Sequence, residues 1–192
     1  MMIRISLVIL SLGALVLTSC TSEYNQYVER EMAKNIENDS LFLGMKMGMT
    51  RKEFYAHCWE LNAQKIISQG EGNQTVRFYI EPDSTQGPEF KKEMLFYGSF
   101  DEEDIMRGMD VTMSYTAWAI WNEEFHSKPL MKDLKEMYQH IYPGNEFIDV
   151  DVEVLDTPAA VKIDGNREIL MYPKGDRFVT VKIRDLNYKL SK

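Results

Sequence analysis

The first strong pattern of apolar positions along the chain has the spacing of a helix. Thr50 and Glu53 form a capping box, in which the hydroxyl accepts from an early backbone amide and the carboxylate reaches back, so we expect a helix to begin there. Phe54, Cys58 and Leu61 then recur three or four positions apart. The spacing predicts a helix with one face packed on a core.

After residue 73 the apolar period changes to two. Val76, Phe78 and Ile80 alternate with polar or charged neighbours and stop at Pro82, which is typical of a strand that is buried on one side. Two further apolar runs follow, separated by a very acidic corner. Three strands are therefore predicted in this part of the chain: 76–81, 94–97 and 109–115.

A second cycle of helix and strands follows. Ser127 is a candidate N-cap and Pro129 falls in the first turn of a predicted helix, which Pro143-Gly144 ends. Its apolar face is Leu130, Leu134, Met137, Tyr138 and Ile141. Asp164-Gly165-Asn166 then predicts a tight hairpin turn. The strands predicted around it are 148–154, 161–163, 169–172 and 179–183.

This order of elements predicts the fold class. Consecutive strands joined by tight turns favour an α+β fold, in which helices pack on one face of an antiparallel sheet, over a parallel sheet with crossovers. We expect a single domain over 43–192. It has two sub-units, 43–125 and 126–192, and an internal duplication is a hypothesis drawn from element order alone.

The N-terminus has the pattern of an export signal. Arg4 precedes an uncharged run of roughly a dozen apolar residues, short of the ~20 that span a bilayer as a helix. The run ends in Leu17-Thr18-Ser19-Cys20, which closely resembles the lipobox of bacterial lipoproteins. The resemblance implies that 1–19 are a signal peptide and that Cys20 carries acyl chains. The alternative is an ordinary secretory signal with a cysteine near the cut.

Charge then limits the partners of the mature chain. Removal of 1–19 leaves 21 basic and 30 acidic residues, a net charge of −9, which repels phosphate backbones and argues against nucleic-acid binding. The lipid on Cys20 is thus expected to hold the protein at the membrane. Residues 20–42 are expected to form a tether, which is either partly helical or a disordered spacer. Cys58 would be the remaining thiol, so no internal disulfide is expected.

A second resemblance concerns the start of the domain. Residues 44–54, Gly-Met-Lys-Met-Gly-Met-Thr-Arg-Lys-Glu-Phe, are similar to the "Gly-Met-Thr then helix" opening of the BamE/SmpA-type lipoproteins and of β-lactamase-inhibitor-protein-like repeats. The usual Gly-Pro after the first helix is absent. The resemblance implies a helix-then-sheet unit that serves as a scaffold or binding module.

An aromatic cluster is the first choice for a binding surface. Tyr115, Trp118, Trp121 and Phe125 follow the third predicted strand, at its connection to the second helix. Clustered aromatic side chains can stack on sugars or anchor a protein partner. The alternative is that they pack inside, across the junction of the two sub-units.

Cys58 and its neighbour His57 raise the hypothesis of a thiol nucleophile. Neighbours in a helix point about 100° apart, so this pair is not expected to face each other. We therefore favour Cys58 as a small core residue.

Histidines and carboxylates offer no pattern of metal ligands. The three histidines lie far apart in the sequence, and none belongs to a metal-binding pattern such as HxH or HExxH. They are His57, His126 and His140, and the position of His140 near a helix end suits a structural role. The dense carboxylates could hold calcium, but they lack the EF-hand spacing. An acidic turn and a solvated strand face explain them better. These carboxylates are Asp101, Glu102, Glu103 and Asp104, and then Asp149, Asp151 and Glu153.

We therefore expect a membrane-tethered, non-catalytic binding or accessory protein of the bacterial cell envelope, as an outer membrane lipoprotein facing the periplasm or the cell surface. The sequence lacks a nucleotide loop, a nucleophile elbow and metal spacing, which favours binding over catalysis and predicts no cofactor and no metal. The expected partner is an envelope protein or a glycan. Two alternatives stay open: an envelope enzyme acting on glycan or peptide, and a sugar-binding or small-ligand-binding lipoprotein.

Overall fold

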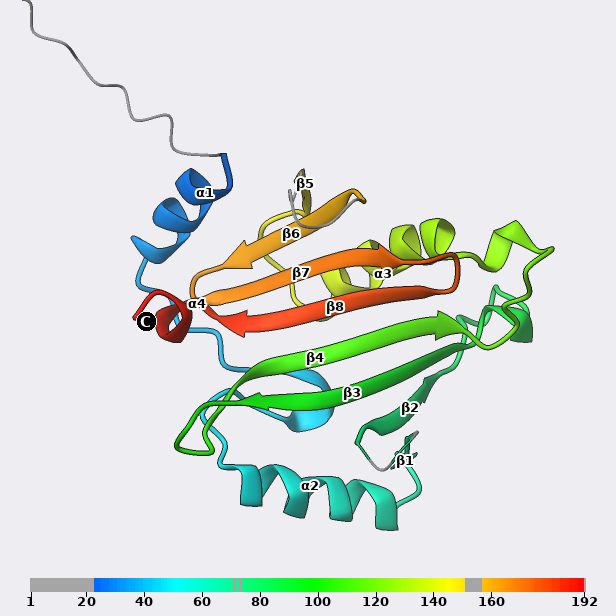
Figure 1. Ribbon diagram of the computed structural model, residues 1–192, viewed down its shortest axis with the longest axis horizontal. Coiled ribbons are helices and arrows are strands. Elements are labelled where there is room, and N and C mark those ends of the chain that lie inside the picture. The colour runs from blue at the N-terminus through cyan, green and yellow to red at the C-terminus, as the bar shows by residue number, and fades with distance from the viewer. Residues whose placement is uncertain (1–22, 71, 73, 151–156, 192) are drawn as a thin grey trace, which may run out of the picture.

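Over the residues that the structure describes, the chain forms one antiparallel sheet of eight strands with helices packed against it (Figure 1). The computed structural model describes residues 23–70, 72, 74–150 and 157–191. This architecture confirms the α+β prediction. The helices are α1 (Glu23–Met32), α2 (Arg51–Ala63), α3 (Ser127–Ile141) and α4 (Leu186–Lys189), with 3-10 turns η1 (Phe42–Gly44), η3 (Pro88–Phe90) and η4 (Glu123–Phe125). The strands are β1 (Ser68–Gln69), β2 (Val76–Ile80), β3 (Lys92–Phe100), β4 (Met106–Tyr115), β5 (Ile148–Val150), β6 (Ala159–Asp164), β7 (Arg167–Lys174) and β8 (Phe178–Asp185).

The strand order, β1-β2-β3-β4-β8-β7-β6-β5, shows how the two halves meet. Each half is a helix followed by four strands, and the last strands of the halves, β4 and β8, pair antiparallel at the centre. Gly108 lies opposite Arg184, and a Cβ on this glycine would come within 2.0 Å of the carbonyl oxygen of Ile183. The halves therefore share one continuous sheet, and their origin by duplication stays a hypothesis.

Helix α2 begins as the capping box predicts. The amide of Glu53 donates to the Thr50 hydroxyl at 3.2 Å, and the amide of Thr50 donates to the Glu53 carboxylate at 2.7 Å. Phe54 is fully buried and meets the ring of Phe100 edge to face, with ring centroids 5.5 Å apart. The helix thus covers the core on the side of β3.

Helix α3 covers the other half of the same core. Leu130, Leu134 and Tyr138 are buried, as the spacing predicted. The predicted N-cap is wrong by one residue, because His126 occupies that position with extended backbone. Ser127 is the first helical residue, and its hydroxyl donates to the Gly175 carbonyl at 2.7 Å. The start of α3 is therefore bound to the β7–β8 turn instead of being capped locally.

The opposite face of the sheet is covered at one end by α1 and α4. Val161 and Ile163 point to that face and pack with Tyr27, Val28 and Leu186. In Figure 1 this face is turned to the viewer, with α3 behind the sheet. Beyond α1 and α4, no helix of the described residues covers the strands on this side, and this is where the candidate site lies.

Helix α1 lies within 20–42, the segment that was expected to be a tether, and it packs on the sheet. The Tyr27 hydroxyl both accepts from the amide of Ile163 and donates to its carbonyl, at 3.1 Å each. Glu31 is 2% exposed and pairs with Lys34 at 2.7 Å. The residues from Glu23 onward are thus part of the folded domain.

The β6–β7 hairpin turns at Gly165-Asn166, as predicted. Gly165 has φ +57°, and a Cβ there would lie 2.1 Å from the carbonyl oxygen of Ile36. The amide of Asn166 donates to that same carbonyl at 3.2 Å. The hairpin therefore holds the segment that follows α1. The backbones of Gly165 and Ile36 lie so close that a side chain at position 165 would not fit.

Candidate binding groove

A groove of about 1070 Å³ lies where the β7–β8 turn meets the start of α3 and extends onto the sheet. Its lining comes from β4, β7, β8, the β7–β8 turn and the start of α3. The lining residues are Thr112, Glu123, His126, Ser127, Lys128, Pro129, Thr157, Tyr172, Pro173, Lys174, Gly175, Asp176, Thr180 and Lys182. Elements far apart in the sequence thus build one concave surface.

The part of the groove on the sheet is formed by polar side chains of neighbouring strands. Thr112 on β4 lies opposite Thr180 on β8, and Tyr172 on β7 lies opposite the same threonine. Thr180 alternates with the buried Val179 and Val181, and the other two residues likewise follow buried neighbours on their own strands, so all three point away from the core. The result is a surface of hydroxyl groups, which can donate and accept hydrogen bonds.

Lys182 places a positive charge at this surface. Asp110 lies opposite it in the register, but the carboxylate of Asp110 pairs with Arg184 at 2.5 Å. Lys182 has no ion-pair or hydrogen-bond partner among the described residues. It also lines a second hollow of about 430 Å³, together with Arg107 and Lys189. The Lys182 ammonium is therefore available to an acidic group of a ligand.

His126 and Ser127 line the groove, but they do not form a nucleophile pair. The Ser127 hydroxyl donates to Gly175, and the Nε2 of His126 lies 3.2 Å from the carbonyl of Ala119. The buried serine fixes the β7–β8 turn, and the histidine fixes the loop before α3. The geometry assigns both side chains to structure.

The loop between β4 and α3 carries two large apolar side chains at its tip. Ile120 is 70% exposed and Trp121 is 85% exposed. The chain continues directly from this tip to Glu123 and His126 in the groove lining. Trp118, half-buried, supports the loop, because Arg177 lies over its ring at 5.3 Å from the centroid. The tip is therefore an exposed apolar rim beside a polar groove.

The four aromatic residues predicted as a binding surface are placed very differently. Trp121 is exposed and Trp118 is half-buried, whereas Tyr115 is 1% exposed and Phe125 is 4% exposed. The rings of Tyr115 and Phe125 meet 5.3 Å apart in the core. The Tyr115 hydroxyl donates to Asp133 at 2.6 Å, and burial, followed by this contact, raises its pKa. Tyr115 and Phe125 thus lie in the core, and binding stays a prediction for Trp118 and Trp121.

Cys58 is half-buried against the core and lines two shallow apolar hollows of about 330 and 470 Å³ beside β2. Burial raises the pKa of its thiol to about 11, so the thiol is protonated near neutral pH. The Nε2 of His57 lies 2.7 Å from the carbonyl of Leu43 and takes no part in these hollows. The geometry gives no support to a Cys58–His57 nucleophile.

The acidic corner is held by structural contacts. Asp101 accepts from the amides of Glu103 and Ile105 and pairs with Arg107 at 2.8 Å. These amide hydrogen bonds, which outweigh desolvation, lower its pKa. Asp104 pairs with Arg51 at 2.7 Å. The corner therefore closes a turn and fastens α2.

Other predicted sites are partly outside the described residues. Asp149 pairs with Lys135 at 2.5 Å, while Asp151 and Glu153 are not among the described residues, and neither is Cys20.

Across the described ranges, no group of three His, Cys, Asp or Glu side chains is placed to hold a metal ion. None of the helices in those ranges combines the length and hydrophobicity of a transmembrane span.

Sequence reasoning missed the residues of the groove itself. Thr180 and Lys182 alternate with the apolar positions of the last strand, a pattern that predicts a strand and no binding site. The pattern does show that the face is polar. Its concave shape depends on β4, β7 and α3, which no local pattern of β8 reveals.

Comparison with known proteins returned no match: no family model matches the chain, and neither a curated protein nor a solved structure is significantly similar to it. The lipobox resemblance and the resemblance to BamE/SmpA-type and β-lactamase-inhibitor-protein-like units stay predictions. The groove and the exposed apolar side chains beside it are therefore the features that bear on function.

Proposed function

We propose that this protein is a lipoprotein of the bacterial cell envelope that is tethered through Cys20 and acts by binding another envelope protein. The export signal and the Leu17-Thr18-Ser19-Cys20 motif support the tether. The groove with its exposed apolar rim supports the binding role. An outer membrane location, facing the periplasm or the cell surface, is part of the same proposal.

The exposed tip of the β4–α3 loop is the observation that carries the binding role. Ile120 and Trp121 would leave a large apolar area in water unless a partner covers it. Tryptophan is enriched among the residues that dominate protein–protein affinity, and such anchors are surrounded by polar rims. Beside the tip, the groove supplies threonine hydroxyls and the ammonium of Lys182. A protein segment with an apolar residue and a nearby carboxylate matches this surface.

A protein partner fits better than a glycan. A sugar needs an aromatic face in the groove, next to planar polar groups. Here Tyr172 lines the groove but is half-buried, while the exposed Trp121 stands at the rim beside aliphatic Ile120. The mixture of an apolar tip with scattered charges is typical of a protein interface.

The test is site-specific photo-crosslinking in the native envelope. A photoreactive amino acid at position 121 or 180 should capture the same protein, while position 59 serves as the control. Trp59 is also a highly exposed tryptophan, at 75%, on α2 and outside the groove lining. Capture at position 59, with none at 121 or 180, would contradict the proposed surface.

Two substitutions sharpen this test. Trp121→Ala removes the anchor, and Lys182→Glu reverses the charge that faces the partner. Both should reduce the yield of the crosslink formed from position 180, and Trp59→Ala should leave it unchanged.

Detergent-phase partitioning and mass spectrometry of the intact protein, with Cys20→Ala as the control, test the acylation.

A further inference from the structure

The first described residue of the chain already belongs to a docked helix. Tyr27 and Val28 are buried against Val161 and Ile163 of β6. The Tyr24 hydroxyl, in the first turn of α1, donates to the carboxylate of Glu168 on β7. Glu31, near the other end of α1, is buried and accepts from the side chain of Asn145. Contacts along the whole helix therefore hold α1 on the sheet, so the start of α1 moves with the domain.

Covalent geometry then limits how far this start can be from a lipid anchor. Two residues, Thr21 and Ser22, lie between Cys20 and Glu23, so the chain makes three steps of at most 3.3–3.6 Å each, or about 10 Å in all. If the acyl chains on Cys20 lie in the bilayer, the N-terminal end of α1 lies within about 10 Å of the interface. An acylated Cys20 would therefore be joined to α1 by a short connection of two residues.

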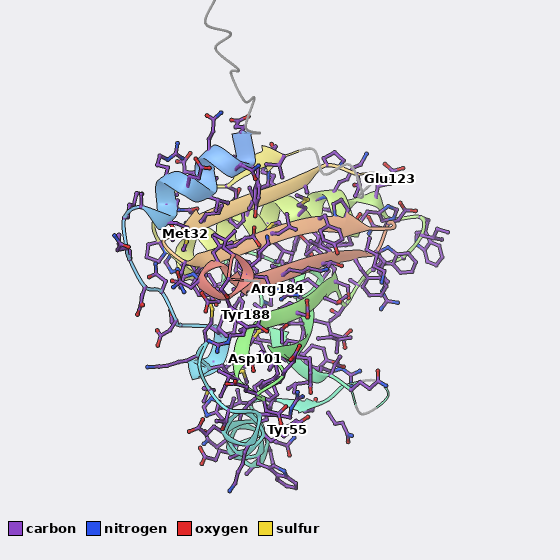
Figure 2. The ribbon with its side chains drawn as sticks, turned by 60° about the vertical axis from the view of Figure 1, so that its left-hand side comes forward. Met32, Tyr55, Asp101, Glu123, Arg184 and Tyr188 are labelled. Carbon is purple, nitrogen blue, oxygen red and sulfur yellow. The ribbon has the colours of Figure 1, made fainter. Side chains whose placement is uncertain are left out.

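The structure also shows on which side of the domain the N-terminal end of α1 lies. The chain enters α1 at the top of Figure 1, on the side of edge strand β5, and α2 lies at the bottom. Figure 2 is turned about the vertical axis and keeps the same heights, with the labelled Tyr55 of α2 at the bottom. The two views agree that the N-terminal end of α1 and helix α2 lie at opposite ends of the domain.

We infer that the side formed by the N-terminal end of α1 and by β5 is a membrane-facing surface, held against the lipid bilayer, and that α2 points away from it. A folded body that cannot enter the bilayer, and that has one surface point within about 10 Å of it, must turn that side to the lipid. This inference rests on the proposed acylation of Cys20. It places the exposed Tyr55 and Trp59 of α2 farthest from the membrane.

The experiment uses the full-length, acylated protein in vesicles of phosphatidylethanolamine and phosphatidylglycerol that carry an energy acceptor in the headgroup region. A donor is attached through an unnatural amino acid at exposed Asp149 on β5 or at Trp59 on α2. Transfer should be severalfold more efficient from position 149 than from position 59. Equal transfer from both positions, or stronger transfer from 59, would overturn the inferred orientation.

A matched pair of insertions tests the short connection. About ten Gly and Ser residues between Ser22 and Glu23 add a coil with an r.m.s. span of about 17 Å, so transfer from position 149 should fall toward that from position 59. The same insertion between Ser84 and Thr85, in an exposed turn, should change nothing. An unchanged contrast between positions 149 and 59 after the first insertion would also contradict the inference.

Mass spectrometry distinguishes a failure of the inferred orientation from a failure of the proposed acylation. Acyl chains on Cys20 together with equal transfer would overturn the orientation and leave the proposed tether intact. An intact leader without acyl chains would overturn the tether, and the orientation with it.

Discussion

Replacing Tyr27 by Phe removes a hydroxyl that takes the place of a missing strand neighbour. Strand β5 begins at Ile148, which lies opposite Val161, so β5 does not reach Ile163. The backbone groups of Ile163 on this side are instead bound by the Tyr27 hydroxyl, at 3.1 Å to the amide nitrogen and 3.1 Å to the carbonyl oxygen. Phenylalanine keeps the buried ring and loses both hydrogen bonds.

The two backbone groups respond differently to this loss. The carbonyl of Ile163 still accepts from the side-chain amide of Asn145 at 2.7 Å. The amide of Ile163 has no such replacement among the described residues and becomes a buried donor without an acceptor. An unsatisfied buried backbone group costs about 1–3 kcal/mol. We therefore expect Tyr27→Phe to lower the free energy of unfolding by about 1–3 kcal/mol.

Urea denaturation followed by circular dichroism measures this change. The midpoint should fall while the slope of free energy against urea stays constant, since the same surface is exposed on unfolding. Hydrogen exchange of the Ile163 amide should become faster in the variant. Tyr79→Phe is the control, because Tyr79 is exposed and its substitution should shift the unfolding free energy by no more than about 0.5 kcal/mol.

The hydrogen bonds between Tyr27 and Ile163 would be contradicted if Tyr27→Phe were as stable as the parent and the exchange of the Ile163 amide did not change. That result would mean that α1 is not docked on β6 in solution. The membrane-facing surface would then lose its structural basis, because the start of α1 would no longer move with the domain.

Four further predictions concern the hairpin, a buried acid, the thiol and the groove rim. Gly165→Ala should destabilise the fold by about 1–3 kcal/mol in thermal or urea unfolding, since its φ is positive and its Cβ would meet the Ile36 carbonyl. Burial raises the pKa of Glu31, but hydrogen bonds from Lys34 and Asn145 outweigh this and lower the pKa overall. Its contribution is therefore present above the unfolded pKa and lost as pH falls through the folded pKa, so the stability deficit of Glu31→Gln should shrink in acid. Alkylation of Cys58 should be slow at neutral pH and accelerate toward pH 11, as followed by mass spectrometry, and fast labelling at pH 7 would contradict the raised pKa. Trp121→Ala should leave the unfolding free energy within about 0.5 kcal/mol of the parent, because its side chain is exposed.

The sequence by itself determined the local elements of this protein. The capping box at Thr50 and Glu53 starts α2, Pro143-Gly144 follows the end of α3, and Gly165-Asn166 turns the β6–β7 hairpin. Each signal acts over a few residues, through a cap, a fixed φ or a tight turn, so it can be recognised without the rest of the fold. The alternation of apolar residues also determined which face of β8 is buried.

The partners of those elements were decided by the tertiary structure. The pairing of β4 with β8 joins segments about seventy residues apart, and no local pattern specifies it. The same holds for the aromatic cluster: Phe125 and Trp121 are four positions apart, yet one packs on Tyr115 in the core and the other lies in solvent. Burial depends on what the rest of the chain brings to each side chain. For that reason the docking of α1 and the groove around Lys182 exist only in the folded protein.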